Sequence, residues 1–126
     1  MKFMLLCYDD EEAWSKAGDD ALDTAVKEAV ALTHELDARG AYLRAAPLHP
    51  VATATSVRVR DGKCIITDGP FAETREQLGG FYLVDVDSLE DAVSIAARHP
   101  GARLGTVEVR PILEIAGLPD PPDSKL

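Results

Sequence analysis

The chain has 126 residues, of which 46% are hydrophobic and 28% charged, as is typical of one globular domain with an ordinary core. Its formal net charge is −9 and its 13 basic residues form no stripe, which argues against nucleic-acid binding. Its apolar runs are far shorter than the roughly 20 residues of a membrane-spanning helix, and no signal peptide is recognisable, so we expect a cytoplasmic protein without a membrane partner.

The chain begins with a predicted strand and a polar loop. Residues 2–8 are almost wholly apolar, which is typical of a strand buried on both faces. Residues 9–19 are polar and predict the loop that ends this strand. Trp14 is the large apolar side chain of this loop, and two interpretations stay open. It covers a cleft or an oligomer interface, or it lies over the edge of the core.

A long helix is predicted next. Asp19 or Asp20 is suited to cap its first turn, and Gly40 is suited to end it, because glycine tolerates a left-handed backbone. His34, near the end of the helix, is expected at the surface. The residues expected to face the core recur at spacings of four and three: Leu22, Val26, Ala29, Thr33 and Leu36.

A short strand and a β-hairpin are predicted after the helix. Residues 41–46 form the strand. Residues 53–60 then alternate in period two, Asp61–Gly62 is a strong signal for a two-residue turn, and residues 63–67 return as the partner strand.

One histidine lies in a stiff turn between this strand and the hairpin. Pro47 and Pro50 bracket His49 and restrict its backbone. This position makes His49 the best-placed histidine for chemistry, although a solvated loop histidine is the plainer interpretation.

The second half of the chain predicts a strand, a helix and a final strand. Residues 79–86 form the strand, and Ser88 is suited to cap the following helix by accepting the Asp91 amide. Residues 105–115 form the last strand, which Pro111 places at a sheet edge or a bulge. The expected buried face of the helix consists of Leu89, Ala92, Val93, Ala96 and Ala97.

Without the hairpin, the order of elements is βαββαβ, which predicts an α+β, ferredoxin-like fold with an inserted hairpin. We expect one domain over residues 1–116 and a flexible Pro- and Asp-rich tail over residues 117–126. Helices would cover one face of the antiparallel sheet and leave an apolar patch on the other. A second copy is the economical cover, so we expect a homodimer.

The cysteines and known motifs predict neither a metal site nor a cofactor. Cys7 and Cys64 lie in apolar strand patterns without metal-ligand spacing. A disulfide stays open, but reduced, buried thiols are the favoured interpretation. The sequence has no Walker loop, no GxGxxG motif and no cluster of metal ligands.

The most polar stretch, residues 67–81, lies between two strand-like runs. Asp68 begins a tight Asp-Gly-Pro turn and can accept hydrogen bonds from backbone amides. In one interpretation the rest is a solvated turn with an Arg75–Glu73 or Arg75–Asp68 ion pair. In the other it faces a ligand, and neighbouring carboxylates raise each other's pKa for acid–base work. The side chains that exceed the needs of a turn are Glu73, Arg75, Glu76 and Gln77.

The sequence closely resembles the YCII-related, DGPF-domain family in the run Thr67-Asp68-Gly69-Pro70-Phe71-Ala72-Glu73-Thr74-Arg75-Glu76-Gln77-Leu78-Gly79-Gly80-Phe81-Tyr82. Residues 57–63 and 107–111 also resemble that family, and the likeness runs from about residue 1 to residue 115. The family commonly has lysine where this chain has Arg75. The resemblance implies a ferredoxin-like fold of the dimeric α/β-barrel type, and most members have no established activity.

The resemblance also implies candidate roles. Related YCII proteins have a proposed histidine–aspartate pair, which by analogy makes Asp68 the acid. No histidine of this chain matches that pair residue by residue, so His49 is a candidate through its place before the hairpin. Some DGPF proteins are encoded with, or fused to, sigma factors of the extracytoplasmic-function type, which implies a regulatory setting.

Three functions therefore compete. The first is a cofactor-independent small-molecule enzyme that uses acid–base chemistry at a cleft centred on Asp68, with His49 sharing the proton. Arg75, Glu73 and Gln77 would bind its ligand, a small anionic metabolite. The second is a non-catalytic dimeric ligand-binding or regulatory module that acts with a sigma-factor-type regulator. The third is a dimeric scaffold in which Asp68 and Glu73 fix a turn.

Overall fold

The computed structural model describes residues 1–71 and 74–120, and it confirms the predicted α+β class. Its main sheet has four antiparallel strands in the order β2-β5-β1-β6, so the first strand of the chain lies inside the sheet. Strands β3 and β4 form a separate two-stranded sheet. The strands of the main sheet are β1 (Lys2–Asp9), β2 (Tyr42–Pro47), β5 (Gln77–Asp85) and β6 (Thr106–Pro111).

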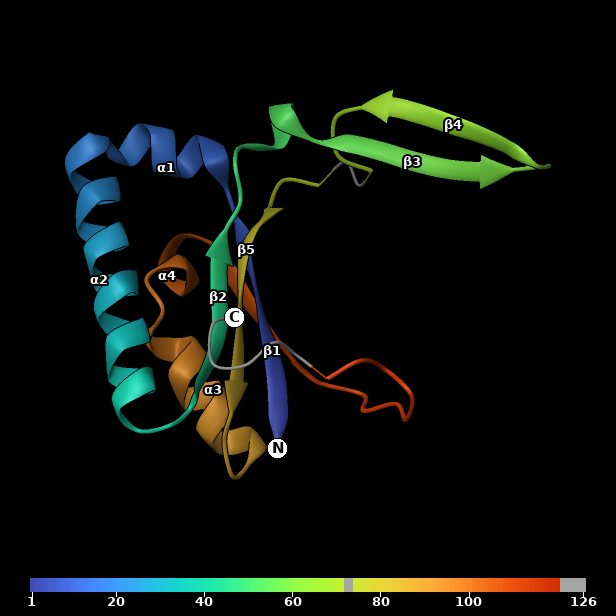
Figure 1. The fold of residues 1–126 in the computed structure, drawn as a ribbon. Helices are drawn as coiled ribbons and strands as arrows, with labels where there is room; N and C mark the ends of the chain where they lie inside the picture. Colours follow the sequence, from blue (N-terminus) through green and yellow to red (C-terminus); the bar gives the residue numbers. More distant parts are fainter. Residues whose placement is uncertain (72–73, 121–126) are drawn as a thin grey trace.

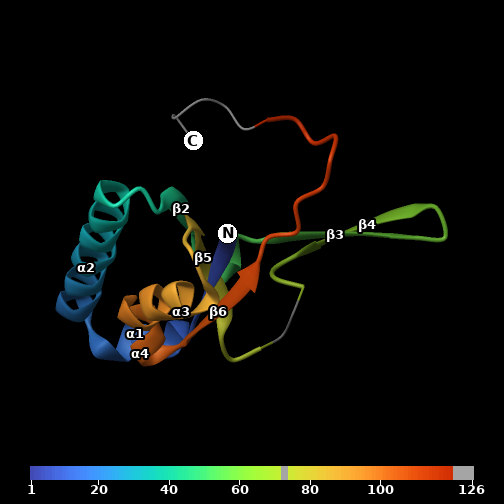
Figure 2. The ribbon, with the colours of Figure 1, turned by 90° about the horizontal axis from the view of Figure 1, so that it is seen from below.

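The helices lie on one side of the main sheet (Figure 1, Figure 2). No helix in the described ranges is long and apolar enough to cross a membrane. A short 3₁₀ turn, η1 (Val51–Thr53), leads from β2 toward the hairpin. The helices are α1 (Glu11–Ala17), α2 (Asp19–Ala38), α3 (Leu89–Arg98) and α4 (Gly101–Leu104).

The core lies between the main sheet and helices α2 and α3. Phe3, Leu5 and Cys7 of β1 are buried toward the helices, because alternate side chains of a strand point to the same face. Val84 of β5 lies opposite Phe3 and extends this face. The helices contribute Leu32, Leu36, Ala92, Ile95 and Ala96.

Helix α2 packs on the core through one face. Ala25, Leu32 and Leu36 on this face are buried. Leu22 and Val26 are 46% and 53% exposed. The stripe predicted from the sequence was therefore right for Leu36 and wrong for Leu22 and Val26, because these two side chains line a cleft and are not buried in the core.

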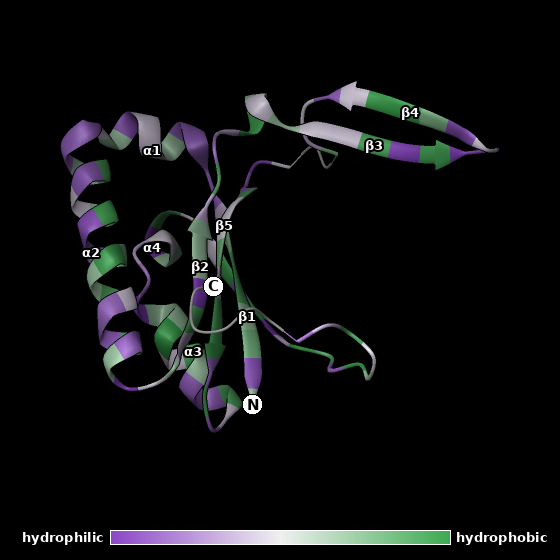
Figure 3. Ribbon diagram, viewed as in Figure 1, coloured by the Kyte–Doolittle hydropathy of each residue, from purple (hydrophilic) through white to green (hydrophobic). Residues whose placement is uncertain are grey.

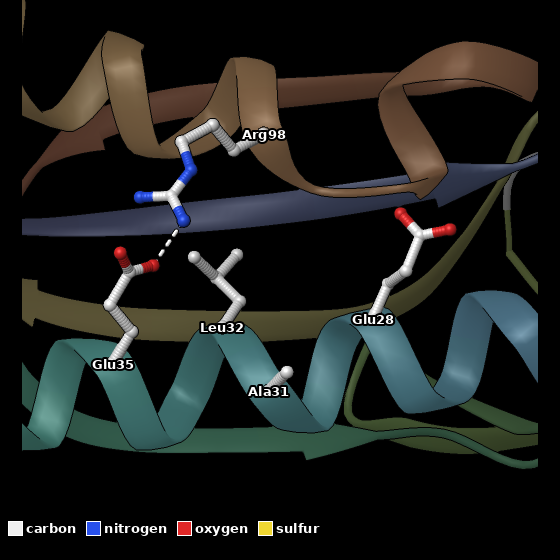
Figure 4. Close-up of a pocket in the computed structure, with 5 residues that line it drawn as sticks. All are labelled: Glu28, Ala31, Leu32, Glu35 and Arg98. Atoms are coloured by element: carbon white, nitrogen blue, oxygen red, sulfur yellow. Dashed lines mark hydrogen bonds and ion pairs between the residues drawn. The ribbon is translucent and has the colours of Figure 1, made fainter.

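Ion pairs join α2 to α3 and α4. Arg98 of α3 points toward Glu35 and pairs with it (Figure 4). Arg103 of α4 donates to both carboxylate oxygens of Glu28, at 3.0 and 3.1 Å. Such partly exposed pairs orient helices more than they stabilise them. A shallow groove of about 400 Å³ between the helices is lined by Glu28, Ala31, Leu32, Glu35 and Arg98.

Residues 9–19, which the sequence predicts as a loop, contain helix α1. Asp10 caps it, because its Oδ1 accepts a hydrogen bond from the Ala13 amide at 3.0 Å. Gly18, with a φ of 94°, separates α1 from α2 and occupies the position expected for an aspartate cap. The prediction missed α1 because the helix has no buried residue, so it shows no apolar periodicity.

The second half of the chain confirms some predictions and corrects others. Ser88 caps α3 as predicted, because its Oγ accepts a first-turn amide at 3.2 Å. The predicted buried face of α3 was right for Ala92 and Ala96, which are buried, and wrong for Leu89 and Val93, which are each 50% exposed. Ile95, which the prediction omitted, is 1% exposed. The last strand ends at Pro111 instead of residue 115, and it is an edge strand, as this proline predicted.

The predicted hairpin is present as β3 (Thr55–Arg60) and β4 (Lys63–Asp68), and it extends away from the main sheet (Figure 1). Asp61 and Gly62 form its turn, with φ values of 51° and 74°. Two consecutive positive φ values are the backbone that an Asp-Gly turn favours in a two-residue hairpin.

One face of the hairpin is apolar and exposed. Val57 lies opposite Ile66, and Val59 opposite Cys64, so these four side chains share a face. Val57 and Ile66 are 62% and 66% exposed, and the middle of β4 has the green of hydrophobic residues in Figure 3. Cys64 is a free, exposed cysteine, which corrects the prediction of two buried thiols; Cys7 is free and buried.

The face of the main sheet that points away from the helices is also apolar. Met4 lies opposite Leu83, and Leu6 opposite Phe81, in neighbouring strands. All four are half-buried. The hairpin extends on the side of the main sheet opposite the helices (Figure 2).

Candidate functional site

A large cleft lies between α2 and the main sheet, with a volume of about 790 Å³. Leu22, Val26 and Val30 of α2 form one wall. Tyr42 and Ala45 of β2 belong to the facing wall. Ala25 and Leu32 of α2 are buried, whereas the three apolar side chains of the wall remain about half exposed. Its polar lining groups include Asp9, Glu11, Asp19, His49, Tyr82 and His99.

Asp9 is the carboxylate at the inner end of this cleft. It is the last residue of β1, on the same face as Leu5 and Cys7, so the pleat directs it toward the helix side of the sheet. The pairing of β1 with β5 shifts at this point: Cys7 lies opposite Gly80 and Tyr8 opposite Leu78. Gly79 is thus the extra residue of a β-bulge, a feature that re-aims side chains beside active sites.

Two glycines make room for the Asp9 side chain. A Cβ added to Gly79 would lie 1.9 Å from Asp9 Oδ2 and 2.9 Å from its Cγ. A Cβ added to Gly101 would lie 3.5 Å from Asp9 Oδ1 and 2.9 Å from His99 Nδ1. The carboxylate therefore lies against the Gly79 backbone, and both Asp9 and His99 lie next to Gly101.

The pKa of Asp9 is raised from its ordinary value of 3.8, chiefly because burial disfavours the carboxylate. Hydrogen bonding by the Trp14 side chain acts in the opposite direction, and the negative charges of Glu11 and Glu76 raise the pKa further. Trp14 lines the cleft, which favours the first of the two interpretations of this residue.

His99 lies between α3 and α4 and is held from two sides. Its Nδ1 accepts a hydrogen bond from the Gly101 amide at 3.0 Å. Its ring meets the Tyr82 ring edge-on, with 5.1 Å between centroids. Burial, followed by the nearby positive charge of Arg103, lowers the pKa of His99 below 6.5. The imidazole is therefore neutral at pH 7.

Two further groups in the lining are held in their neutral forms. Burial raises the pKa of the Cys7 thiol and of the Tyr82 phenol to about 12. Tyr82 also donates from its hydroxyl to the carbonyl oxygen of Ala29 at 3.2 Å, which ties α2 to the sheet across the cleft. A thiol with a raised pKa is a poor nucleophile, so Cys7 serves as lining.

The residues predicted as functional from the sequence are spread over the molecule. His49 lines the cleft and is exposed. Asp68 is exposed at the end of β4 and is not among the lining residues of the cleft in the described ranges. Glu73 lies outside the described residues. The pairing of Asp68 and His49 in one site stays a prediction.

The remaining two predicted residues have local partners. Arg75 pairs with Asp10 at 3.1 Å, an alternative to the two ion pairs considered from the sequence. The Ala13 amide, and then Arg75, lower the pKa of Asp10. The Gln77 side chain donates to the carbonyl oxygen of Thr74. Ligand binding by Arg75 and Gln77 therefore stays a prediction as well.

Sequence reasoning missed Asp9 and His99. The signal for Asp9 was present, because it continues the period-two series of Phe3, Leu5 and Cys7 and so falls on the buried face of its strand. His99 carries no comparable signal, since its contacts come from Tyr82 and from backbone that folds around it. Within the described ranges, no group of three or more potential metal ligands occurs.

We expect Gly79→Ala to destabilise the fold through its clash with Asp9. The free energy of unfolding should fall by about 1–3 kcal/mol, as at other overpacked sites. Asp9→Ala should relieve this clash, because the Cβ that remains at residue 9 would lie 3.5 Å from the new Cβ at residue 79. A double-mutant cycle by urea unfolding measures this coupling. Equal costs of Gly79→Ala in both backgrounds would contradict the contact.

We expect His99 to make stability depend on pH. Between pH 6.5 and the lower folded pKa, the unfolded chain binds a proton that the folded chain does not, so stability falls as pH falls through this window. The urea concentration at the midpoint of unfolding should fall when the pH is lowered from about 7.5 to about 5.5, and His99→Gln should make this fall smaller. His34→Gln replaces an exposed histidine of α2 and is the matched control, so it should leave the fall of the urea midpoint unchanged.

Two comparisons bear on the family of this chain. The model of the YCII-related domain matches residues 1–116, a range that includes Asp9, Gly79 and His99. An uncharacterised protein of Rhizobium meliloti (strain 1021) is 38% identical over 117 residues, covering 89% of this chain and 92% of the relative. These matches confirm the resemblance seen in residues 67–82, and the chain belongs to the YCII-related family.

Proposed function

We propose that the protein is a cofactor-independent small-molecule enzyme that transfers protons in the cleft between α2 and the main sheet. The observation that carries this proposal is the opposite displacement of two pKa values at one place: that of Asp9 is raised and that of His99 is lowered. These shifts make the carboxylate a stronger base and keep the imidazole uncharged, which suits proton removal beside a carbonyl.

The hydrogen bond to His99 assigns it a distinct role. Because Nδ1 accepts from the Gly101 amide, the neutral ring carries its proton on Nε2. Nε2 can then donate to a substrate carbonyl oxygen. A neutral donor of this kind stabilises the negative charge that develops on that oxygen.

The proposed step balances without a redox partner. Asp9 removes a proton from the carbon beside the carbonyl, so a C–H bond breaks and an O–H bond forms on the carboxylate. The electron pair moves into the enolate, whose oxygen accepts the hydrogen bond from His99. Return of the proton to a different carbon gives an isomer, and return to the same carbon gives hydrogen exchange.

The regulatory alternative uses the same cleft without chemistry. In this alternative, a ligand fills the cleft between α2 and the sheet, and the ligand-bound protein acts with a sigma-factor-type regulator. The cleft alone is compatible with both functions. The two displaced pKa values favour the enzyme, because a purely apolar binding site has no need of a buried carboxylate with a raised pKa.

Hydrogen exchange tests the chemistry directly. A panel of apolar aryl ketones and keto esters is incubated in D₂O, and loss of the proton signal beside the carbonyl is followed by NMR. We expect Asp9→Asn to slow exchange by about 10²- to 10⁴-fold, the usual contribution of a general base. Asp68→Asn tests the base predicted from the sequence in the same assay.

The two aspartate variants give opposite outcomes. Under the proposal, Asp68→Asn keeps the wild-type rate, since Asp68 is exposed on the hairpin. If Asp68→Asn slowed hydrogen exchange and Asp9→Asn did not, Asp68 would be the general base instead of Asp9. Ligand-induced amide shifts at residues 77–82 without any exchange would support the regulatory alternative.

We also propose that the chain is a homodimer with a ferredoxin-like arrangement in each subunit. The strand order β2-β5-β1-β6 supports that arrangement, and the half-buried face at Met4, Leu6 and Leu83 supports a second copy as its cover. A two-stranded hairpin is at best marginally stable alone, so the exposed Val57 and Ile66 also favour a partner.

Light scattering measures the oligomeric state. We expect a dimer mass for the wild type, and a shift toward monomer for Leu83→Glu and for Ile66→Glu. Val93→Glu, an equally polar change on the helix side, should keep the dimer mass because Val93 is 50% exposed on α3. A monomer mass for the wild type at micromolar concentration would contradict the dimer.

A further inference from the structure

We propose that the cleft takes an elongated apolar molecule that bears no negative charge, and that it prefers an ammonium group to a neutral one. This ligand class rests on the proposed function of the same cleft. Two observations support it: the apolar residues of α2 that line the cleft, and the negative sign of the charged residues at the opening of the cleft.

The apolar wall gives the length of the ligand. Leu22, Val26 and Val30 recur every four residues on α2, are 46%, 53% and 50% exposed, and line the cleft. A strip from Leu22 to Val30 is about 12 Å long at the rise of an α-helix. A ligand of the size of a bicyclic aromatic would bury these side chains against the opposite wall at Tyr42.

The charges of the lining are of one sign. Asp9, Glu11 and Asp19 line the cleft, and in the described part of the chain no lysine or arginine does. Glu11 is further fixed at the mouth, because its Oε2 accepts a hydrogen bond from the Val51 amide of η1 at 3.1 Å. An anionic ligand would therefore meet negative potential without a cation to bind it.

Four basic side chains on the surrounding elements are bound by acids outside the lining. Each of these pairs uses the charge that an anionic ligand would need. The four positive groups belong to α1, α3 and α4 and to the segment before β5. The pairs are Lys16–Glu12, Arg75–Asp10, Arg98–Glu35 and Arg103–Glu28.

The buried histidine does not replace these cations. His99 Nδ1 is occupied by the Gly101 amide, and the ring packs edge-on against Tyr82. The Arg103 charge beside it opposes a second positive charge. The neutral ring donates a single hydrogen bond from Nε2, which fits a carbonyl or hydroxyl oxygen on the ligand.

Three naphthalenes of equal size test the charge rule: 2-naphthylmethylamine, 2-naphthylmethanol and 2-naphthoate. Binding to the full chain is measured at low salt by ¹H–¹⁵N NMR titration. We expect the amine to bind most tightly and the carboxylate about tenfold more weakly than the alcohol, because exposed charges act through water. The shifted amides should belong to α2, Trp14, residues 77–82 and residues 99–101.

Paired variants separate the mouth charges from general surface charge. Asp19→Asn and Glu11→Gln should each reduce the preference for amine over alcohol by about twofold to threefold at low salt. Asp20→Asn and Glu12→Gln remove neighbouring charges that do not line the cleft, and they should leave the preference unchanged. Circular dichroism confirms that each variant is folded.

The outcomes distinguish this inference from the proposed chemistry. Carboxylate binding as tight as that of the alcohol would overturn the ligand class, and so would the absence of cleft shifts with all three compounds. Binding in the predicted order without hydrogen exchange on the ketone panel would support the ligand class and count against the enzyme.

Discussion

The contact between the Asp9 carboxylate and the backbone of Gly79 is the constraint on which the candidate site depends. It requires a strand that ends in an acid on its buried face, and a facing strand without a side chain at that point. The bulge places Gly79 beside the acid, and because Gly79 has no side chain, the carboxylate can lie 1.9 Å from the position a Cβ would take. Burial then raises the Asp9 pKa.

Helix α2 divides stability from binding between two of its faces. Ala25, Leu32 and Leu36 are buried, and ion pairs of Glu28 and Glu35 join the helix to its neighbours. Leu22 and Val26 remain about half exposed toward the cleft. Apolar side chains kept out of the core are unfavourable in the empty protein, and a bound molecule that covers them recovers this free energy.

Much of the fold was predictable, because local patterns report local structure. Alternating residues in 53–60 with Asp61–Gly62 predicted the hairpin, and Ser88 predicted the start of α3. The errors share one cause. The pattern at Leu22 marks an apolar side chain without saying whether the core or a cleft receives it, and α1 has no buried face to produce a pattern.

The sequence by itself determined the family, the α+β class and the polar segment before β5, because these follow from residue order alone. The tertiary structure alone decided which acid and which histidine lie beside the same glycine in one cleft. Asp9 and His99 are 90 positions apart and converge at Gly101, while Asp68, in the most conspicuous motif, lies on an exposed hairpin. Burial and proximity produce the displaced pKa values, and both are properties of the folded chain.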